Sequence, residues 1–145
     1  MTHLVPLSIA LVVLAPAVLH ASQHTYEIEG LIAFPGDGTI YVYLVDEEAF
    51  EKPLTGIQTI VIDPDERQVT DKIARFRFDG VPAGTYGIRS FQDTNGDGKL
   101  NKGVFGPSEP WGMSWKASKP SRWPRFDQIA FDVSADVVNL LIELK

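Results

Sequence analysis

The fold of this chain is decided by residues 73–92, IARFRFDGVPAGTYGIRSFQ. In residues 73–78, a set that includes Arg75 and Arg77 alternates with a wholly apolar set. This alternation is typical of a strand with one face on a core and one face toward solvent. Residues 79–84 carry Asp, Gly and Pro and are predicted to turn the chain, and residues 85–92 form a second strand. The side chains predicted to face the core are Ala74, Phe76 and Phe78.

Similar short runs, separated by turn-forming residues, lie on both sides of this segment. The predicted strands are residues 26–34, 39–46, 57–62, 73–78, 85–92, 127–133 and 137–144, the last two forming a final pair. Both faces of residues 39–46 are apolar, which indicates a central or covered strand. Only residues 47–52 suit a helix, of a single turn. The pattern predicts an all-β fold, an antiparallel Ig-like or prealbumin-like β-sandwich of about seven strands.

One long loop, residues 103–126, has no periodicity and contains all three tryptophans. Loops of this length in a compact domain are often functional. One interpretation is that the indole faces form a platform for a glycan or a peptide. The other is that they cap one end of the sandwich as part of the core. The candidate ligand-binding residues are Trp111, Trp115 and Trp123.

The N-terminus resembles a secretory signal peptide. The first 22 residues contain no Asp, Glu, Lys or Arg, residues 4–19 are almost wholly apolar, and small residues follow at Ala21 and Ser22. We predict a signal peptide at residues 1–21 and a single domain at 22–145. A membrane anchor is the rival interpretation, but the run carries two prolines and is shorter than the ~20 apolar residues of a span. The expected product is periplasmic or secreted, without a membrane span after cleavage, and is taken as a monomer.

Composition excludes several classes of function. The net charge is −6, whereas nucleic-acid binding requires clustered Lys and Arg. The chain has no cysteine, and His24 is the one histidine beyond the predicted signal peptide. Ser–His and Cys–His nucleophiles and His-rich zinc sites are therefore not expected. We predict a protein that is not an enzyme. The alternative is a carboxylate-based hydrolase that uses Glu109 with Asp93 or Asp127.

The clearest chemical signal is residues 93–101, DTNGDGKLN. Oxygen-bearing side chains stand at loop positions 1, 3, 5 and 9, a glycine stands at position 6, and position 7 supplies a backbone carbonyl, as in D-x-[DN]-x-[DN]-G calcium loops. The predicted ligands are Asp93, Asn95, Asp97, Lys99 through its carbonyl, and Asn101. Calcium is expected to be a structural cofactor.

The rest of the calcium motif is missing. An EF-hand has a bidentate Glu at position 12, where this chain has Val104, and the flanking residues suit strands and turns rather than helices. Glu109 is the nearest downstream carboxylate and is the candidate for the missing ligand. The alternative is a metal-free turn, because Asn, Asp and Gly also dominate turns.

Residues 76–88, FRFDGVPAGTYGI, resemble the F-x-F-x-x-[LV]-P-x-G-x-Y segment of transthyretin-like and carboxypeptidase-regulatory-like β-sandwiches. Together with DTNGDGKLN, GPSE at 106–109 and FD at 126–127, they resemble a narrower bacterial family, domain of unknown function 2141. The chain departs from that family's usual pattern with Gln92 in place of His and Asp97 in place of Asn. The resemblance implies an exported or periplasmic β-sandwich without an established activity.

These observations predict an exported, non-enzymatic, calcium-binding accessory or binding module of the bacterial cell envelope. Its expected partner is an unknown envelope protein or glycan. The alternative function is glycan or peptide binding by the tryptophan-rich loop, residues 103–126.

Overall fold

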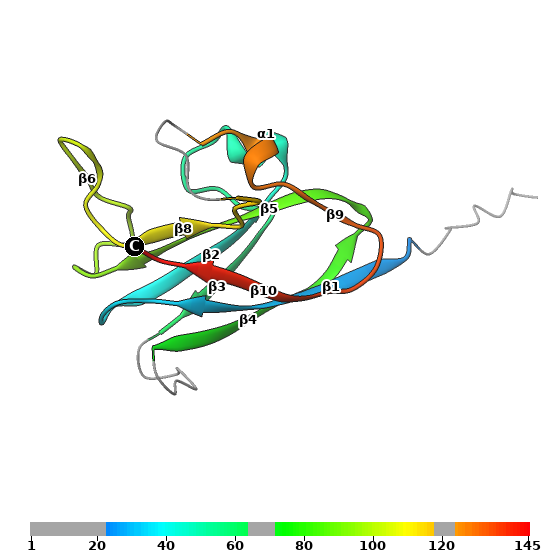
Figure 1. Ribbon diagram of the computed structural model, residues 1–145, viewed down its shortest axis with the longest axis horizontal. Coiled ribbons are helices and arrows are strands. Elements are labelled where there is room, and N and C mark those ends of the chain that lie inside the picture. The colour runs from blue at the N-terminus through cyan, green and yellow to red at the C-terminus, as the bar shows by residue number, and fades with distance from the viewer. Residues whose placement is uncertain (1–22, 64–71, 118–123) are drawn as a thin grey trace, which may run out of the picture.

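The computed structural model describes residues 23–63, 72–117 and 124–145. Two β-sheets face each other across a core (Figure 1). The three-stranded sheet has the order β10-β1-β4, with bounds β1 Thr25–Ala33, β4 Ile73–Pro82 and β10 Val137–Glu143. The five-stranded sheet has the order β3-β2-β5-β8, with β9 also on β5, and comprises β2 Thr39–Val45, β3 Gln58–Ile62, β5 Gly84–Asp93, β8 Trp111–Met113 and β9 Phe131–Val133. The predicted all-β sandwich is confirmed.

The remaining elements lie on the connections. They are the helix α1 Glu47–Phe50, the short 3-10 helix η2 Phe126–Gln128, and a two-stranded hairpin of β6 Lys102–Gly103 and β7 Gly106–Pro107. The predicted single helical turn after residue 46 is confirmed by α1. Within the described ranges, no helix is long and apolar enough to cross a bilayer. The predicted signal peptide, residues 1–21, and Trp123 lie outside the described residues.

The main core fills the space between the two sheets. The predicted inward residues of β4 are all buried, as are alternate residues of β1 and β2. A second buried cluster lies on the outer face of the five-stranded sheet and includes Tyr43, Val45 and Phe91. The central strand β2 therefore has apolar side chains on both faces, as predicted, because each face is covered.

The prediction of a turn at residues 79–84 is wrong for most of that stretch. β4 continues to Pro82, and its pairing with β1 shifts between Tyr26 and Ile28, so that a bulge forms at Asp79-Gly80. Gly80 has a φ of 68°, the left-handed conformation that glycine tolerates in such bulges. Asp-Gly suits a bulge as well as a turn. The chain then passes from the three-stranded sheet to the five-stranded sheet between β4 and β5.

The predicted final strand pair is also wrong. β9 pairs antiparallel with β5, whereas β10 pairs in parallel with β1, so the two strands belong to different sheets. The start of the predicted strand at 127 is instead part of η2. The short connection between them carries Asp136, whose Oδ1 accepts a hydrogen bond from the Glu27 backbone at 2.9 Å. This contact holds the start of β10 beside β1. Because β1 and β10 are parallel, the fold is not the wholly antiparallel sandwich that was predicted.

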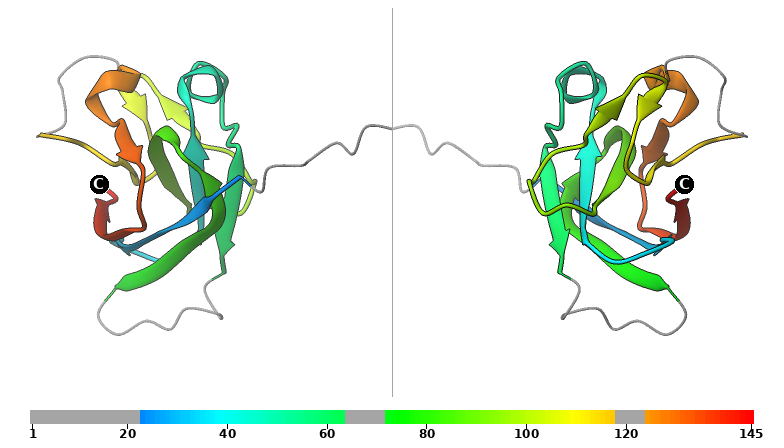
Figure 2. Two further views of the ribbon diagram at one scale, coloured as in Figure 1. Left: turned by 90° about the vertical axis from the view of Figure 1, so that its right-hand side faces the viewer. Right: turned by 90° about the vertical axis from the view of Figure 1, so that its left-hand side faces the viewer.

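The predicted structureless loop contains a third strand on β5. β8 pairs with β5 in the register Arg89 with Met113 and Phe91 with Trp111. The backbones of Trp111 and Lys145 exchange two hydrogen bonds of 3.2 Å, which join β8 to the end of the chain after β10. The two sheets are thereby connected along this side (Figure 2).

Candidate functional site

The candidate calcium loop begins at the last residue of β5. Asp93 pairs with Thr39 of β2 and is only 2% exposed, so its carboxylate is held at the end of the five-stranded sheet. A Cβ added to Gly38 would stand 2.1 Å from the Asp93 backbone oxygen. The close approach of these two backbone segments therefore requires glycine at position 38. The position of Asp93 is therefore set by the sheet rather than by the loop.

The loop wraps around the Asp93 carboxylate. Oδ1 accepts hydrogen bonds from the backbone of Gly96 at 2.7 Å and of Asp97 at 3.3 Å, and Oδ2 accepts one from Gly98 at 2.7 Å. Gly96 and Gly98 have φ values of 76° and 73°, which the wrapping requires. A metal-free Asx turn makes such bonds. A carboxylate oxygen has further lone pairs, so these bonds do not occupy its whole capacity for a cation.

The side chains at the next three predicted ligand positions meet one another. Asn95 Nδ2 donates to Asn101 Oδ1 at 3.0 Å, and Asn101 Nδ2 donates to Asp97 Oδ2 at 3.0 Å. The hydrogen bond that Asn101 donates is the largest of the causes that lower the pKa of Asp97 from its ordinary value. Lys99 donates its backbone N–H to Asp97 Oδ1 at 2.9 Å. The structure thus brings Asn95, Asp97 and Asn101 together at one point.

Glu109 lies behind the loop and joins its two ends. Its carboxylate is buried, at 5% exposure, and Oε1 accepts from the Thr94 backbone at 2.9 Å and the Thr94 hydroxyl at 3.2 Å. Oε2 accepts from the Asn101 backbone at 3.0 Å. Sequence reasoning selected Glu109 as the nearest carboxylate but missed this role and the contribution of Thr94, since both depend on the path of the chain after the loop.

The carboxylate count of the site is small. Among residues 23–63, 72–117 and 124–145, no three His, Asp or Glu side chains gather in a way that could hold a metal ion. A cation in the loop would therefore rest on Asp93 and Asp97 together with amide and carbonyl oxygens. Asp127, proposed as a partner for a hydrolase, lies on η2 in an exposed ion pair with Arg125, at 2.9 Å.

The two described tryptophans belong to the outer cluster of the five-stranded sheet. Trp111 and Trp115 stand edge to face, with ring centroids 6.1 Å apart, and both pack partly buried against the cluster that includes Tyr43 and Phe91. This packing is the one expected for aromatic residues that cap an apolar face. Trp111 also lines an adjoining hollow.

Arg89, which the sequence analysis did not select, lies in the floor of this hollow. Its guanidinium donates to the backbone carbonyls that end α1 and follow it, those of Ala49, Phe50, Lys52 and Thr55. It also lies over the ring of Tyr43, 5.8 Å from the centroid. Burial lowers the pKa of Arg89 from its ordinary value. The charge is thus compensated by carbonyl dipoles at a helix end.

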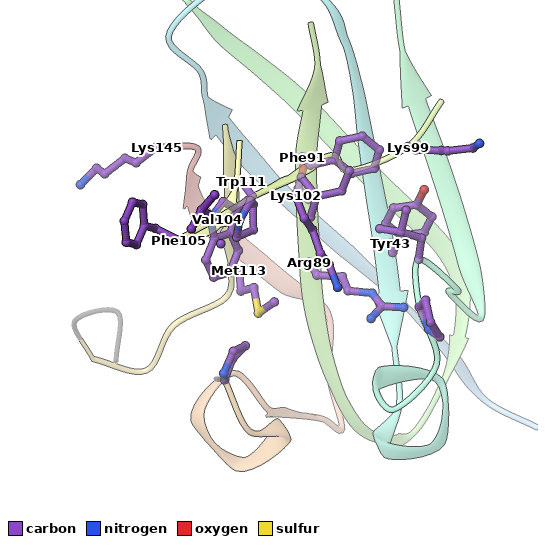
Figure 3. A pocket seen from close by; sticks show the side chains of 17 residues that line it. Tyr43, Arg89, Phe91, Lys99, Lys102, Val104, Phe105, Trp111, Met113 and Lys145 are labelled. Carbon is purple, nitrogen blue, oxygen red and sulfur yellow. The ribbon is translucent and has the colours of Figure 1, made fainter. Parts of the chain in front are cut away.

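The hollow itself is open and measures about 1010 Å³ (Figure 3). Its floor is the outer face of the five-stranded sheet, and one side is formed by residues from Lys99 to the β6–β7 hairpin. Among the residues that the structure describes, its lining includes four cationic residues and no Asp or Glu. The cationic residues are Arg89, Lys99, Lys102 and Lys145.

Comparison with known proteins gives one match. A family model described as an uncharacterized protein conserved in bacteria (DUF2141) matches residues 27–140. No curated protein and no solved structure matches the chain.

Proposed function

The chain belongs to the bacterial family of domain of unknown function 2141, and from that premise we propose that it is an exported, calcium-binding β-sandwich. It serves as a non-enzymatic accessory or binding module of the cell envelope. The apolar, uncharged segment at residues 4–19 supports export. Fractionation of cells that express the whole chain, with N-terminal sequencing of the product, tests this part.

The observation that carries the calcium proposal is the meeting of loop positions 3, 5 and 9. Asn95, Asp97 and Asn101 lie within hydrogen-bond distance of one another, at 3.0 Å for the two closest pairs. Calcium prefers oxygen ligands from carboxylates, amides and carbonyls in this type of loop. The two amide groups would turn their oxygens toward the ion, which needs rotation of side chains only.

Each residue has a distinct part in the proposed site. Asp93 and Asp97 supply the charge, Asn95 and Asn101 supply amide oxygens, and Lys99 supplies its carbonyl. Because Glu109 bonds the backbone at both ends of the loop, it acts as a positioning residue. Direct ligation by Glu109 stays a prediction. With two carboxylates in the loop, we expect a Kd of about 10⁻⁴–10⁻³ M, as in extracellular modules.

Calorimetric titration of the purified protein with calcium is the direct test. Binding heat that saturates in the millimolar range supports the proposal. The competing metal-free turn is favoured by the three backbone hydrogen bonds to Asp93 and predicts no saturable heat.

A second function, glycan or peptide binding through the tryptophan region, is supported by the exposure of Trp111 to the hollow. Aromatic faces stack on apolar ligand faces. Quenching of tryptophan fluorescence by an added oligosaccharide or peptide tests it. Unchanged fluorescence would assign Trp111 and Trp115 to the apolar cluster alone.

A further inference from the structure

The hairpin that follows the candidate calcium loop presents two large apolar side chains to solvent. β6 and β7 pair Lys102 with Pro107 and Gly103 with Gly106, and the two residues between the strands are Val104 and Phe105. Val104 is 93% exposed and Phe105 is 103% exposed, so the described residues cover neither of them. Two-residue hairpin tips favour Gly, Asn and Asp. Turn formation therefore does not account for Val-Phe at this tip.

The base of the hairpin is fixed to the body of the protein. The Asn101 backbone donates to Glu109, and its carbonyl accepts from the Ser108 backbone at 2.9 Å. Glu109 is itself buried. The hairpin extends away from the two sheets at one end of the molecule (Figure 1). The apolar tip therefore projects from a hairpin whose base is held in place by the hydrogen bonds of Asn101.

The charged side chains that line the hollow beside the tip are cationic, whereas the nearby acidic residues Asp97 and Glu109 do not line it. Lys99 and Lys102 lie close to it in the chain, and the hollow that Val104 and Phe105 line contains Arg89 and Lys145 as well, with no Asp or Glu among the described residues that line it. Lys145 also pairs with Glu143, which does not line the hollow. The whole chain carries a net charge of −6, so this cationic region stands out from the rest of the sequence. Its charge is complementary to an anionic partner.

We propose that Val104 and Phe105 insert into the interface of an anionic lipid bilayer while Lys99 and Lys102 contact its headgroups. Interfacial binding combines buried apolar area with attraction between basic residues and anionic lipid. A bilayer accommodates a convex apolar tip without a matching pocket, and the lysine side chains reach the headgroup level while their stems stay near the apolar phase. A protein partner would instead need a pocket for Phe105 and a contact area far larger than two residues.

This inference goes beyond the calcium-binding module and does not depend on it. Two apolar residues give only a shallow anchor, since even one acyl chain holds a protein marginally. Binding is therefore reversible and is weakened by salt, which screens the exposed lysines. Such a tip would direct the hollow and the candidate loop toward a membrane surface.

Flotation of the whole chain with lipid vesicles tests the proposal. Vesicles of phosphatidylcholine alone are compared with vesicles that also contain phosphatidylglycerol, in the presence of a chelator so that the outcome is independent of calcium. We expect stronger binding to the phosphatidylglycerol vesicles than to phosphatidylcholine alone. Phe105→Ser should weaken it about tenfold, since a buried Phe contributes a gain of this order. All chains compared share one N-terminus, and the phosphatidylcholine vesicles measure any contribution from residues 4–19, which is subtracted before the variants are compared.

Matched controls separate the tip from general effects. Val61→Ser removes an apolar residue that is 47% exposed on β3 and should leave binding unchanged. Lys99→Gln/Lys102→Gln should weaken binding about tenfold or more, given the contribution of each basic residue near an anionic surface. Lys52→Gln/Lys116→Gln removes the same charge from residues that do not line the hollow and should have little effect. Unchanged thermal unfolding of Phe105→Ser confirms that the variant is folded.

Three results would overturn the proposal. The first is equal flotation of the wild type and Phe105→Ser, or no preference for phosphatidylglycerol. The second is retention on an acidic polysaccharide column without vesicle binding, which would assign the region to a glycan. The third is self-association in sedimentation that Phe105→Ser abolishes, which would assign the tip to a second copy of the chain.

Discussion

Glu109 Oε2 accepts a hydrogen bond from the Asn101 backbone at 3.0 Å, and through this contact a buried carboxylate closes the candidate loop from behind. The other carboxylate oxygen accepts from Thr94, the second residue of the loop. The loop ends are therefore held together before any ion binds. Glu109 also fixes the start of the exposed hairpin, because Asn101 is its base.

Replacement of Glu109 should destabilise the protein whether or not calcium is present. Glu109→Gln keeps the shape but turns an amide N–H₂ toward a backbone N–H, so one buried donor loses its acceptor, at a cost of about 1–3 kcal/mol. The free energy of unfolding from urea denaturation measures this loss. Glu48→Gln, in an exposed pair with Lys52, is the control and should change it by less than about 0.5 kcal/mol. Equal effects of the two variants would contradict the role given to Glu109.

Stabilisation by calcium should require Asp97, whereas Asp93 should also be needed for the stability of the calcium-free protein. At a calcium concentration about tenfold above Kd, binding adds about 1.4 kcal/mol and should raise the Tm of a domain of this size by about 5 °C. Asp97→Ala should abolish that rise and should cost only a small part of the Tm in chelator, because the hydrogen bonds that Asp97 accepts are exposed to solvent.

Asp93→Ala should lower the Tm in both conditions, since Asp93 accepts three backbone hydrogen bonds. Asp127→Ala removes an exposed carboxylate on η2 and should keep the full calcium response. Thermal unfolding of the three variants with calcium and with chelator gives the comparison. A calcium response retained by Asp97→Ala would contradict the proposed site.

The stabilisation contributed by Asp97 should disappear in acid. Hydrogen bonding in the native state lowers its pKa below the ordinary value of 3.8. The unfolded chain therefore binds the proton first as pH falls, so the contribution is present above that value and is lost as pH falls through the folded pKa. The difference in Tm between the wild type and Asp97→Asn should be largest near neutral pH and shrink below about pH 4. A difference that stays constant with pH would show that the effect does not come from the charge.

The joining of β8 to the end of the chain should be sensitive to a single methyl group. A Cβ on Gly112 would lie 2.3 Å from the Glu143 backbone oxygen, which has little freedom to move. Gly112→Ala should destabilise the protein by about 1–3 kcal/mol, the range for overpacking. Gly36→Ala is the matched control, because nothing lies within 4 Å of its added Cβ. Urea denaturation of both variants measures the difference, and equal stability would show that the strand contact shifts easily.

The sequence predicted what depends on local pattern. The alternation of residues 73–78 identified the buried side chains of β4, and the apolar faces of residues 39–46 identified the central strand. Asp79-Gly80 predicts a turn from the local sequence, but the structure has a bulge there, because bulges and turns use the same residues. The sheet to which each strand belongs was not predictable for residues 131–133 and 137–143, since a short connection between strands fits a crossover as well as a hairpin.

For the candidate site, too, the sequence predicted the local features but not those that depend on distant segments. The spacing of Asp93, Asn95, Asp97 and Asn101 was sufficient to place them in one loop, because they are close in the chain. The positioning role of Glu109 and the exposure of Phe105 depend on how later segments pack. Neither leaves a local pattern in the sequence.

The parallel pairing of β1 with β10 has a consequence for the order of folding. The contact between Glu27 and Asp136 joins residues 109 positions apart. Long-range pairing of this kind is slow to form, because a large loop must close before the contact stabilises the chain. During synthesis β1, the middle strand of the three-stranded sheet, emerges early, but its partner β10 is synthesised much later. The three-stranded sheet therefore stays incomplete until β10 is available.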